Sequence, residues 1–349
     1  MALQGPKAPL KTPLQVPLPR QKGRQSVTQT DNSGRLITLI GGSGFLGRHA
    51  VRALARRGFR IRVAVRRPDL AGHLQPLGSV GQIMPVQANV RYPASLAAAC
   101  EGADAVVNFV GVLQPGGAQS FAAVHAFGAE ACARAAHEAG AKSFIQISAI
   151  GADANSASAY ARTKAEGEAR ARAQFANAEV LRPSVVFGPE DDFFNRFATM
   201  ARFSPALPLI GGGQTRFQPV FAGDVGEAIA QLIEAQAADG KTYELGGPEV
   251  LTFRQLLEFV LKVTGRKRLL APLPFPVANI MGTVMQYLPG APITADQVEL
   301  LKSDNVVSAE AAKSGLTLEG LGIQPKAIEA IVPAYLYRYR KAGQFTKID

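Results

Sequence analysis

Short apolar runs alternate with longer amphipathic, alanine-rich segments in the first half of the chain. The runs are LITLIG (36–41), FRIRVAV (59–65), IMPVQA (83–88), AVVNFVG (105–111), FIQIS (144–148) and EVLRPSVVF (179–187). Each has the length of a buried strand, and most intervening segments have helical periodicity. Strands that alternate with helices indicate βαβ units with right-handed crossovers. We therefore expect an α/β fold with a Rossmann-like, doubly wound parallel sheet.

The pattern changes after Gly188, where the alternation weakens and Pro and Gly become frequent. This change predicts a dinucleotide-binding domain over 35–190 and a smaller C-terminal α/β lobe over 191–335, interleaved with the first domain. An extended, basic and proline-rich arm over 1–34 precedes them, and a basic tail over 336–349 follows. A ligand is expected in the crevice between the lobe and the strand ends.

The formal net charge of the 349 residues is +11, and most of it lies in two tails. Residues 1–35 carry +5 and residues 336–349 carry +3, whereas the rest has 28 basic and 25 acidic residues. The tails fit either solvated disorder or docking to an acidic partner or a membrane surface, and we favour docking. A nucleic-acid partner is not expected.

The sequence predicts no membrane span, no signal peptide, no disulfide and no metal site. No run reaches the roughly 18 apolar residues that a membrane span needs. The proline spacing of KAPLKTPLQVPLPRQKGRQ argues against a signal or transit peptide and for a polyproline-like arm. Cys100 and Cys132 each stand alone in a helical pattern, which predicts core thiols in a reducing compartment. The four histidines do not pair at metal-ligand spacing, so no metal site is expected.

A glycine turn follows the first predicted strand. Gly41, Gly44 and Gly47 lie between LITLI and an amphipathic helix. Glycine lets the backbone approach a pyrophosphate, and the helix N-terminus supplies free N–H groups and partial positive charge. Glycines alone would also fit a structural loop. The strand before them, the helix after them and a second strand about 20 residues later favour a dinucleotide site.

The end of the second predicted strand indicates which dinucleotide is bound. AVRRPD puts Arg66 and Arg67 where an NAD-preferring site carries an acid for the ribose hydroxyls. A guanidinium suits a 2′-phosphate, because the two form charge-assisted, often bidentate hydrogen bonds. The sequence therefore favours NADPH, with Arg66 as the expected phosphate ligand and Arg67 as the second candidate. The alternative is a pair of solvated arginines.

Several motifs occur in the order found in one enzyme family. With the glycine turn, the segments NFVGV (108–112), IQISAIG (145–151), SAYARTK (158–164) and LRPSVVFGPE (181–190) resemble the atypical, extended short-chain dehydrogenases/reductases. A narrower resemblance is to the NAD(P)H-binding accessory subunits of respiratory complex I, NADH:ubiquinone oxidoreductase, of alphaproteobacterial or mitochondrial type. It is carried by RPSVVFGPEDDFFNRFATMARF (182–203), LPLIGGGQTRFQPVFAGDVGEAI (207–229) and PITADQVELLKSDNVVS (292–308).

The resemblance implies an NADPH site with named ligands. The pyrophosphate would be held by Gly41, Ser43, Gly44, Phe45, Leu46 and Gly47. Arg66 would take the 2′-phosphate, and Asn89 stands where such folds often place Asp against the adenine. Val110 and Gly111 would pack near the adenine-side ribose. Ser148, Tyr160 and Lys164 would face the nicotinamide and its ribose, and Pro183 would begin the covering loop.

Whether the site turns over a substrate is open at the level of sequence. In active reductases the tyrosine transfers the substrate proton, the lysine lowers its pKa and the serine polarises the carbonyl. Ser148, Tyr160 and Lys164 form that minimal set, but His125 stands where active members usually have an asparagine in the proton relay. His125 also fits a buried core histidine. We expect Tyr160 and Lys164 mainly to hold a tightly bound NADPH, with catalysis lost or vestigial.

The resulting expectation is an accessory subunit that stabilises complex I at its peripheral arm near the membrane. It would be peripheral to the inner membrane, on the cytoplasmic or matrix side. The alternative is an active NADPH-dependent reductase or epimerase that acts on a quinone, an isoprenoid or a sugar nucleotide. A redox-sensing regulatory module is a third reading, with no specific support in the sequence.

Two later segments each allow two structures. In PEDDFFNRFATMARF (189–203), Asp191 and Asp192 are candidate helix caps, and the aromatic stripe fits core packing first and partner contact second. In 271–294, the apolar stretch VANIMGTVMQYL would span about 18 Å as a helix, too short for a bilayer core of about 30 Å. It fits a buried helix or an interfacial helix against lipid or a membrane-embedded partner. We predict the membrane-facing position, together with the basic YLYRYRK (335–341).

Overall fold

The computed structural model of the chain describes residues 32–114, 116, 119–286 and 293–345. The predicted N-terminal arm lies outside the described residues as far as Asp31. The same holds for 287–292 within the predicted membrane-facing segment and for the last four residues of the basic tail.

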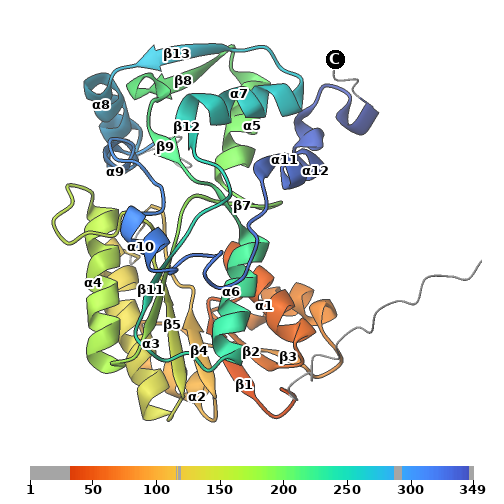
Figure 1. Ribbon diagram of the computed structural model, residues 1–349, viewed down its shortest axis with the longest axis vertical. Helices are drawn as coiled ribbons and strands as arrows, with labels where there is room; N and C mark the ends of the chain where they lie inside the picture. Colours follow the sequence, from red (N-terminus) through yellow and green to blue (C-terminus); the bar gives the residue numbers. More distant parts are fainter. Residues whose placement is uncertain (1–31, 115, 117–118, 287–292, 346–349) are drawn as a thin grey trace, which may run out of the picture. The chain divides into compact units, whose positions relative to one another are not determined.

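A seven-stranded sheet forms the middle layer of the lower part of the molecule in Figure 1. Its strands are β1 (Leu36–Ile40), β2 (Arg60–Val65), β3 (Ile83–Gln87), β4 (Ala105–Asn108), β5 (Ser143–Ile147), β6 (Glu179–Pro183) and β11 (Thr242–Leu245). The order is β11-β6-β5-β4-β1-β2-β3, and every neighbouring pair is parallel. The strand order reverses between β1 and β4, where open α/β sheets bind their ligands. The predicted Rossmann-like, doubly wound sheet is confirmed.

Helices cover both faces of the sheet (Figure 1). One face carries α1 (Phe45–Arg56) and α6 (Ala222–Glu234), and the other carries α2 (Pro93–Cys100), α3 (Phe127–Glu138) and α4 (Ala159–Gln174). Successive strand residues point to opposite faces. On β1, Leu39 therefore joins the α1 and α6 side, whereas Ile40 joins Cys100 and Cys132 on the other. Both cysteines are buried and free, as predicted.

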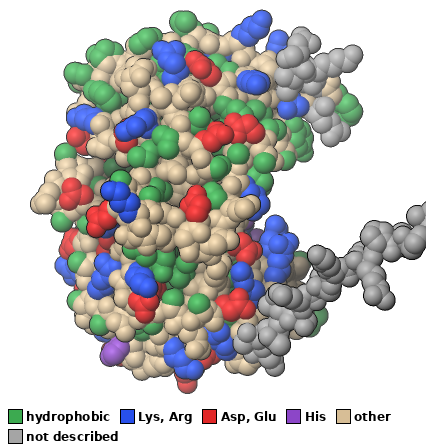
Figure 2. Space-filling view, in the orientation of Figure 1, with side chains coloured by type: hydrophobic (Ala, Val, Ile, Leu, Met, Phe, Trp, Pro, Cys, Tyr) green, Lys and Arg blue, Asp and Glu red, His purple; other side chains and the backbone are tan. Residues whose placement is uncertain are grey.

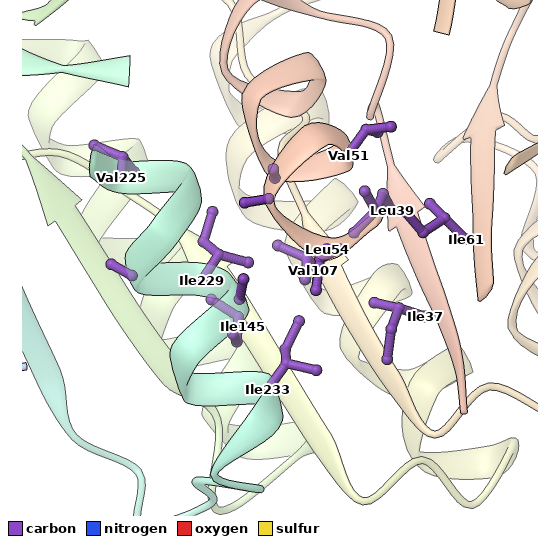
Figure 3. Close-up of a cluster of buried hydrophobic side chains, with 14 of the residues drawn as sticks. Ile37, Leu39, Val51, Leu54, Ile61, Val107, Ile145, Val225, Ile229 and Ile233 are labelled. Atoms are coloured by element: carbon purple, nitrogen blue, oxygen red, sulfur yellow. The ribbon is translucent and has the colours of Figure 1, made fainter. Parts of the chain in front are cut away.

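Helix α6 belongs to the sheet core although it follows Gly188 in sequence. Figure 3 shows Ile229 and Ile233 of α6 pointing toward the strands and α1, and Val225 belongs to the same buried cluster. Gly226 allows the close approach of the two helices, because a Cβ there would lie 2.8 Å from the carbonyl oxygen of His49. The sheet core is thus completed by residues from the second half of the chain.

Most of the remaining elements build a second core that is rich in phenylalanine. The strands are β7 (Val186–Phe187), β8 (Ala206–Ile210), β9 (Arg216–Phe217), β10 (Val220–Phe221), β12 (Leu251–Thr252) and β13 (Leu269–Leu273). The helices are α5 (Phe193–Phe203), α7 (Phe253–Thr264), α8 (Phe275–Met285), α9 (Ala295–Leu300), α11 (Ile328–Ile331) and α12 (Pro333–Leu336). Helix α10 (Ala309–Lys313) instead begins beside β11, where the N–H of Ser308 donates to Glu244. Phe187, Phe194 and Phe253 are almost fully buried in this cluster. Asp191 caps α5, since its Oδ1 accepts the backbone N–H of Phe194 at 2.7 Å.

Helix α8 buries small residues and exposes large ones. Ala278 and Gly282 are its buried residues, and a Cβ at Gly282 would lie 2.7 Å from the backbone nitrogen of Ala295 at the start of α9. Ile280 and Val284 are 68% and 66% exposed. Hydrophobic side chains gather in Figure 2 at the edge where Figure 1 places α8. This arrangement does not fit a buried helix. Among the described residues, no helix combines the length and apolar character needed to cross a bilayer.

Candidate dinucleotide site

The glycine turn has the geometry of a phosphate cradle. Gly41 follows β1 with a φ of +80°, and a Cβ there would lie 3.1 Å from Cγ2 of Val110. A Cβ at Gly47 would lie 2.6 Å from the backbone of Gly42, so only glycine lets α1 pack this closely on the turn. Gly44 is the N-cap of α1 and offers no side-chain acceptor. The first N–H groups of α1, at Phe45 and Leu46, are therefore available to an anion. These features fit the pyrophosphate, and Ser43 lies in the same turn.

The two arginines after β2 differ in what they contact. The guanidinium of Arg67 forms a bidentate ion pair with Asp69, in which Nε lies 2.9 Å from Oδ1 and Nη2 lies 2.7 Å from Oδ2. Arg66 is exposed and makes no hydrogen bond or ion pair with any other described residue. Arg66 is thus the available cation at the carboxyl end of β2, and Arg67 is already engaged.

The predicted adenine-side residues follow β3 and β4. Asn89 sits in a tight turn in which its Oδ1 accepts the N–H of Arg91 at 3.1 Å. Val110 lies across the turn from Gly41, and its N–H donates to Oδ1 of buried Asn108 at 3.0 Å. Asn108 therefore fixes the path of the chain where the strand order reverses. The structure brings Gly41 and Val110 together at that point.

Ser148, Tyr160 and Lys164 line one cavity of about 700 Å³, together with Phe45, Leu46, Gly111 and Pro183. The Oγ of Ser148 is buried and has no hydrogen-bond partner among the described residues. Lys164 is 8% exposed, and its Nζ donates to the carbonyl oxygen of Ile147 at 3.3 Å. The structure therefore brings the three predicted nicotinamide-side residues together. The other predicted ligands are not among the residues that line this cavity.

Burial changes the pKa of both members of the tyrosine–lysine pair. It raises the pKa of Tyr160 to about 12, and the negative charge of Asp296 adds to this shift. It lowers the pKa of Lys164 to about 8, against an opposing effect of Glu168. At neutral pH the hydroxyl of Tyr160 therefore keeps its proton and serves as a donor.

Both ring nitrogens of His125 are used within the fold. Nε2 accepts the N–H of Val112 at 3.1 Å, and Nδ1 lies 3.1 Å from Oγ1 of Thr163. This network assigns the proton to Nδ1, since Nε2 must accept. Burial, with a smaller effect of Lys164, lowers the pKa of His125 to about 3. The neutral ring ties the chain after β4 to α4, which supports a structural role for His125.

Sequence reasoning missed Asp296, which holds the N-terminus of the helix that carries Tyr160 and Lys164. Its carboxylate accepts from Oγ of Ser158 at 2.9 Å and from the N–H groups of Ala159 at 2.6 Å and Tyr160 at 3.2 Å. An acidic group is stabilising at a helix N-terminus. Asp296 lies in the first turn of α9, so an element of the second core positions α4. The segment 292–308 was noted for its resemblance, but spacing alone does not reveal this partner.

Asn305 was also missed, and it joins the loops that follow β5 and β6. Its Oδ1 accepts from Oγ of Ser184 at 2.7 Å and from the N–H of Val185 at 3.0 Å. Its Nδ2 donates to the carbonyl oxygen of Ile150 at 3.1 Å. Because both loops line the cavity, Asn305 fixes its wall.

Comparison with known proteins agrees with this geometry. Residues 41–186 match a family model described as NAD(P)H-binding. The chain is 34% identical to NADH dehydrogenase (ubiquinone) 1 alpha subcomplex subunit 9, mitochondrial, of Arabidopsis thaliana, over 92% of this chain and 81% of that protein. The chain belongs to the subunit 9 family. This membership confirms the resemblance to the NAD(P)H-binding accessory subunits of complex I.

The chain is also similar to a second curated protein and to a solved structure. The ceramide reductase of Caulobacter vibrioides is 32% identical over 71% of this chain and 76% of that protein. The structure of the NADPH-dependent quinone oxidoreductase of Escherichia coli in complex with NADPH is also similar. The structural match covers 86% of this chain and 99% of that chain, with a TM-score of 0.68. At 21% identity, that likeness shows the fold alone. The family match and the geometry support a nicotinamide-dinucleotide site.

Proposed function

We propose that this chain is an NADPH-binding accessory subunit of respiratory complex I with no turnover of its own. The 34% identity over almost the whole chain with a relative named as an NADH dehydrogenase subunit carries the proposal. The structural role of His125 supports the absence of turnover. A tightly bound dinucleotide stabilises a folded state by mass action, about 2.7 kcal/mol at a concentration of 100 times Kd. NADPH would thus act as a structural component.

The exposed guanidinium of Arg66 supports NADPH as the dinucleotide. Arg66→Glu should weaken NADPH binding on the order of tenfold to a hundredfold, because hydrogen bonds to charged groups contribute about 1.5–3 kcal/mol. NADH binding should change little. Arg67→Glu is the matched control and should have the smaller effect, since Arg67 is engaged by Asp69. Dissociation constants from calorimetry test this. Tighter binding of NADH than of NADPH by the unmodified chain would overturn the assignment.

The exposed apolar face of α8 supports a place beside the inner membrane. A basic cluster precedes it in sequence, and Arg266 donates from Nε and Nη2 to the carbonyl oxygen of Tyr339 at 2.9 and 2.8 Å. The basic residues 266–268 are therefore joined to the start of the basic C-terminal tail. Strand β13 separates this basic cluster from α8. An apolar helix face in a chain that also carries basic clusters suits the surface of an anionic bilayer. We place the subunit on the cytoplasmic or matrix side of that membrane, at the peripheral arm.

The partner proposal has a direct test. Native membranes are extracted with a mild detergent, and the assemblies are separated by size. This chain should migrate with NADH:ubiquinone oxidoreductase activity and retain NADPH. Migration as a free protein with no nucleotide would overturn the proposal.

A second candidate function is NADPH-dependent reduction of a carbonyl. It is favoured by the unpartnered Oγ of Ser148 in the same cavity as Tyr160 and Lys164, and by the relative named a ceramide reductase. If it operates, NADPH consumption with a ketone should be abolished by Tyr160→Phe while NADPH binding remains. Consumption that is unaffected by this change would exclude the tyrosine mechanism.

A further inference from the structure

The cavity continues past the nicotinamide-side residues into the second core. One end is formed by Ser148, Tyr160 and Lys164. The other end, the phenylalanine chamber, is formed by Phe193, Phe197, Phe217, Phe253, Ile293 and Leu300. We propose that the phenylalanine chamber binds the hydrocarbon chain of an uncharged lipid whose carbonyl or hydroxyl head lies beside Ser148 and Tyr160. This inference rests on the dinucleotide site of the proposed function, because the nucleotide would form the remaining wall.

The aromatic rings of the chamber form one contact group. The ring centroids of Phe193 and Phe197 are 5.1 Å apart, those of Phe197 and Phe253 are 5.4 Å apart, and those of Phe217 and Phe253 are 6.3 Å apart. The rings come from α5, β9 and α7, so three elements converge on the same space. Aromatic rings offer a ligand apolar contact area and no hydrogen bond. The chamber therefore suits a hydrocarbon chain.

The charges around the cavity argue against a sugar nucleotide. The acidic residues at the chamber end are paired with basic side chains, as Asp192 with Arg196, Glu299 with Lys302, and Asp304 with Arg216. Lys164 and Arg196 are the cations among the described residues that line the cavity. Lys164 lies at the nicotinamide end, so the chamber offers no uncommitted cation to a diphosphate, which binds through charge-assisted hydrogen bonds. An uncharged ligand fits the lining better.

The other end of the cavity supplies donors for a single oxygen. Ser148 is 4% exposed, and its Oγ lacks a partner among the described residues. A buried hydroxyl without a partner is costly, and a ligand oxygen would relieve that cost. The protonated hydroxyl of Tyr160 lines the same space. One polar end and one apolar end together indicate an amphiphile, either a long-chain ketone or acyl lipid, or an isoprenoid quinone.

Binding of defined probes to the NADPH-loaded chain tests the proposal. Equilibrium dialysis is carried out with 2-undecanone, with 2-butanone as the short homologue, and with a decyl-substituted benzoquinone. The undecanone should bind at least about a hundredfold more tightly than butanone, because each added methylene gains burial in the chamber. Tighter binding of the benzoquinone would identify the ligand as an isoprenoid quinone. Tighter binding of the undecanone would identify it as a long-chain ketone or acyl lipid.

Two phenylalanines on α5 provide a matched pair of variants. Phe197 lines the chamber, whereas Phe203 is 78% exposed and does not. Phe197→Asn should weaken undecanone binding about tenfold, and Phe203→Asn should leave it unchanged. Ile293→Trp, which fills the chamber, should give the same loss as Phe197→Asn. NADPH should be retained by all three variants.

The outcomes separate this inference from the proposed function. Equal binding of undecanone and butanone would overturn the proposal that the phenylalanine chamber binds a hydrocarbon chain. Equal effects of Phe197→Asn and Phe203→Asn on undecanone binding would do the same. So would loss of undecanone binding on Ile280→Asp, since the probe would then sit on the exposed face of α8. Failure of the unmodified chain to bind NADPH would instead refute the proposed function.

Discussion

Helices α6 and α8 carry similar apolar spacing and have opposite surroundings. Val225, Ile229 and Ile233 of α6 are fully buried against the sheet and α1 (Figure 3). Ile280 and Val284 of α8, also four residues apart, are exposed. Apolar residues at helical spacing therefore predict a helix with an apolar face. They do not predict whether the chain itself covers that face.

Buried polar side chains near the cavity show the same contrast. Asn108 is buried with its side chain hydrogen-bonded within the fold, whereas Ser148 is buried without a partner. Burial lowers the pKa of Lys164, and no acidic side chain among the described residues forms an ion pair with it. Residues of the first kind maintain the fold. We propose that Ser148, Lys164 and the apolar face of α8 instead contact groups that the chain does not supply.

The largest expected effect is the loss of the α6 contact. Ile229→Asp should lower the free energy of unfolding by more than about 4 kcal/mol, because it buries an unpaired carboxylate. Ile280→Asp makes the same chemical change on α8 and should alter it by no more than about 0.5 kcal/mol. Urea denaturation of both variants with saturating NADPH measures the difference. Equal destabilisation would show that the exposed face of α8 is covered within the chain.

The second effect has the opposite sign. Lys164→Met should stabilise the nucleotide-free chain at pH 7 by about 3 kcal/mol, because the pKa of Lys164 falls from 10.5 to about 8 on folding. Between pH 8 and 10.5 the unfolded chain binds more protons than the folded chain, so the stability of the unmodified protein should rise with pH across that window. The variant should lack this rise and bind NADPH more weakly. A variant that is less stable at pH 7 would contradict the assignment of Lys164 to the ligand.

The features of the fold and the site that could be predicted from the sequence are those set by residues close together in the chain. Features that depend on residues far apart in the chain could not be predicted. The strands up to Pro183 were evident because each apolar run is bounded by turn residues and the glycine turn follows the first. Strand β11 was not predicted, since its four residues, TYEL, are too few to show alternation and pair with β6 from far along the chain. Asp296 accepts a hydrogen bond from Tyr160 at the start of α4, 136 residues away in the sequence. No local sequence pattern predicts this contact.

The third effect concerns the inner side of α8. Gly282→Ala should destabilise the chain by about 1 kcal/mol, although alanine is the better helix former, because the new Cβ meets the backbone of α9. Thr283→Ala, at an exposed position of the same helix, is the control and should be neutral or slightly stabilising. Thermal unfolding of both variants measures this. A stabilising effect of Gly282→Ala would mean that α8 and α9 do not pack as described.

The smallest effect on stability should accompany the largest effect on location. Replacing both Ile280 and Val284 with Asp should leave the free energy of unfolding within about 1 kcal/mol of the unmodified value, since both side chains are exposed. NADPH should be retained. Sedimentation with vesicles of phosphatidylcholine and phosphatidylglycerol should be lost, because the apolar face no longer enters the interface.

The charge of the two aspartates alone could also reduce binding to an anionic bilayer, and α8 offers a matched control for it. Asn279 and Thr283 are exposed polar residues with the same spacing of four. Replacing both with Asp adds the same charge and keeps Ile280 and Val284 in place. If the apolar face makes the contact, this control should still sediment with the vesicles. Equal loss in both double variants would assign the interaction to charge. Unfolding and release of NADPH by the Ile280 and Val284 variant would show that α8 is part of the core.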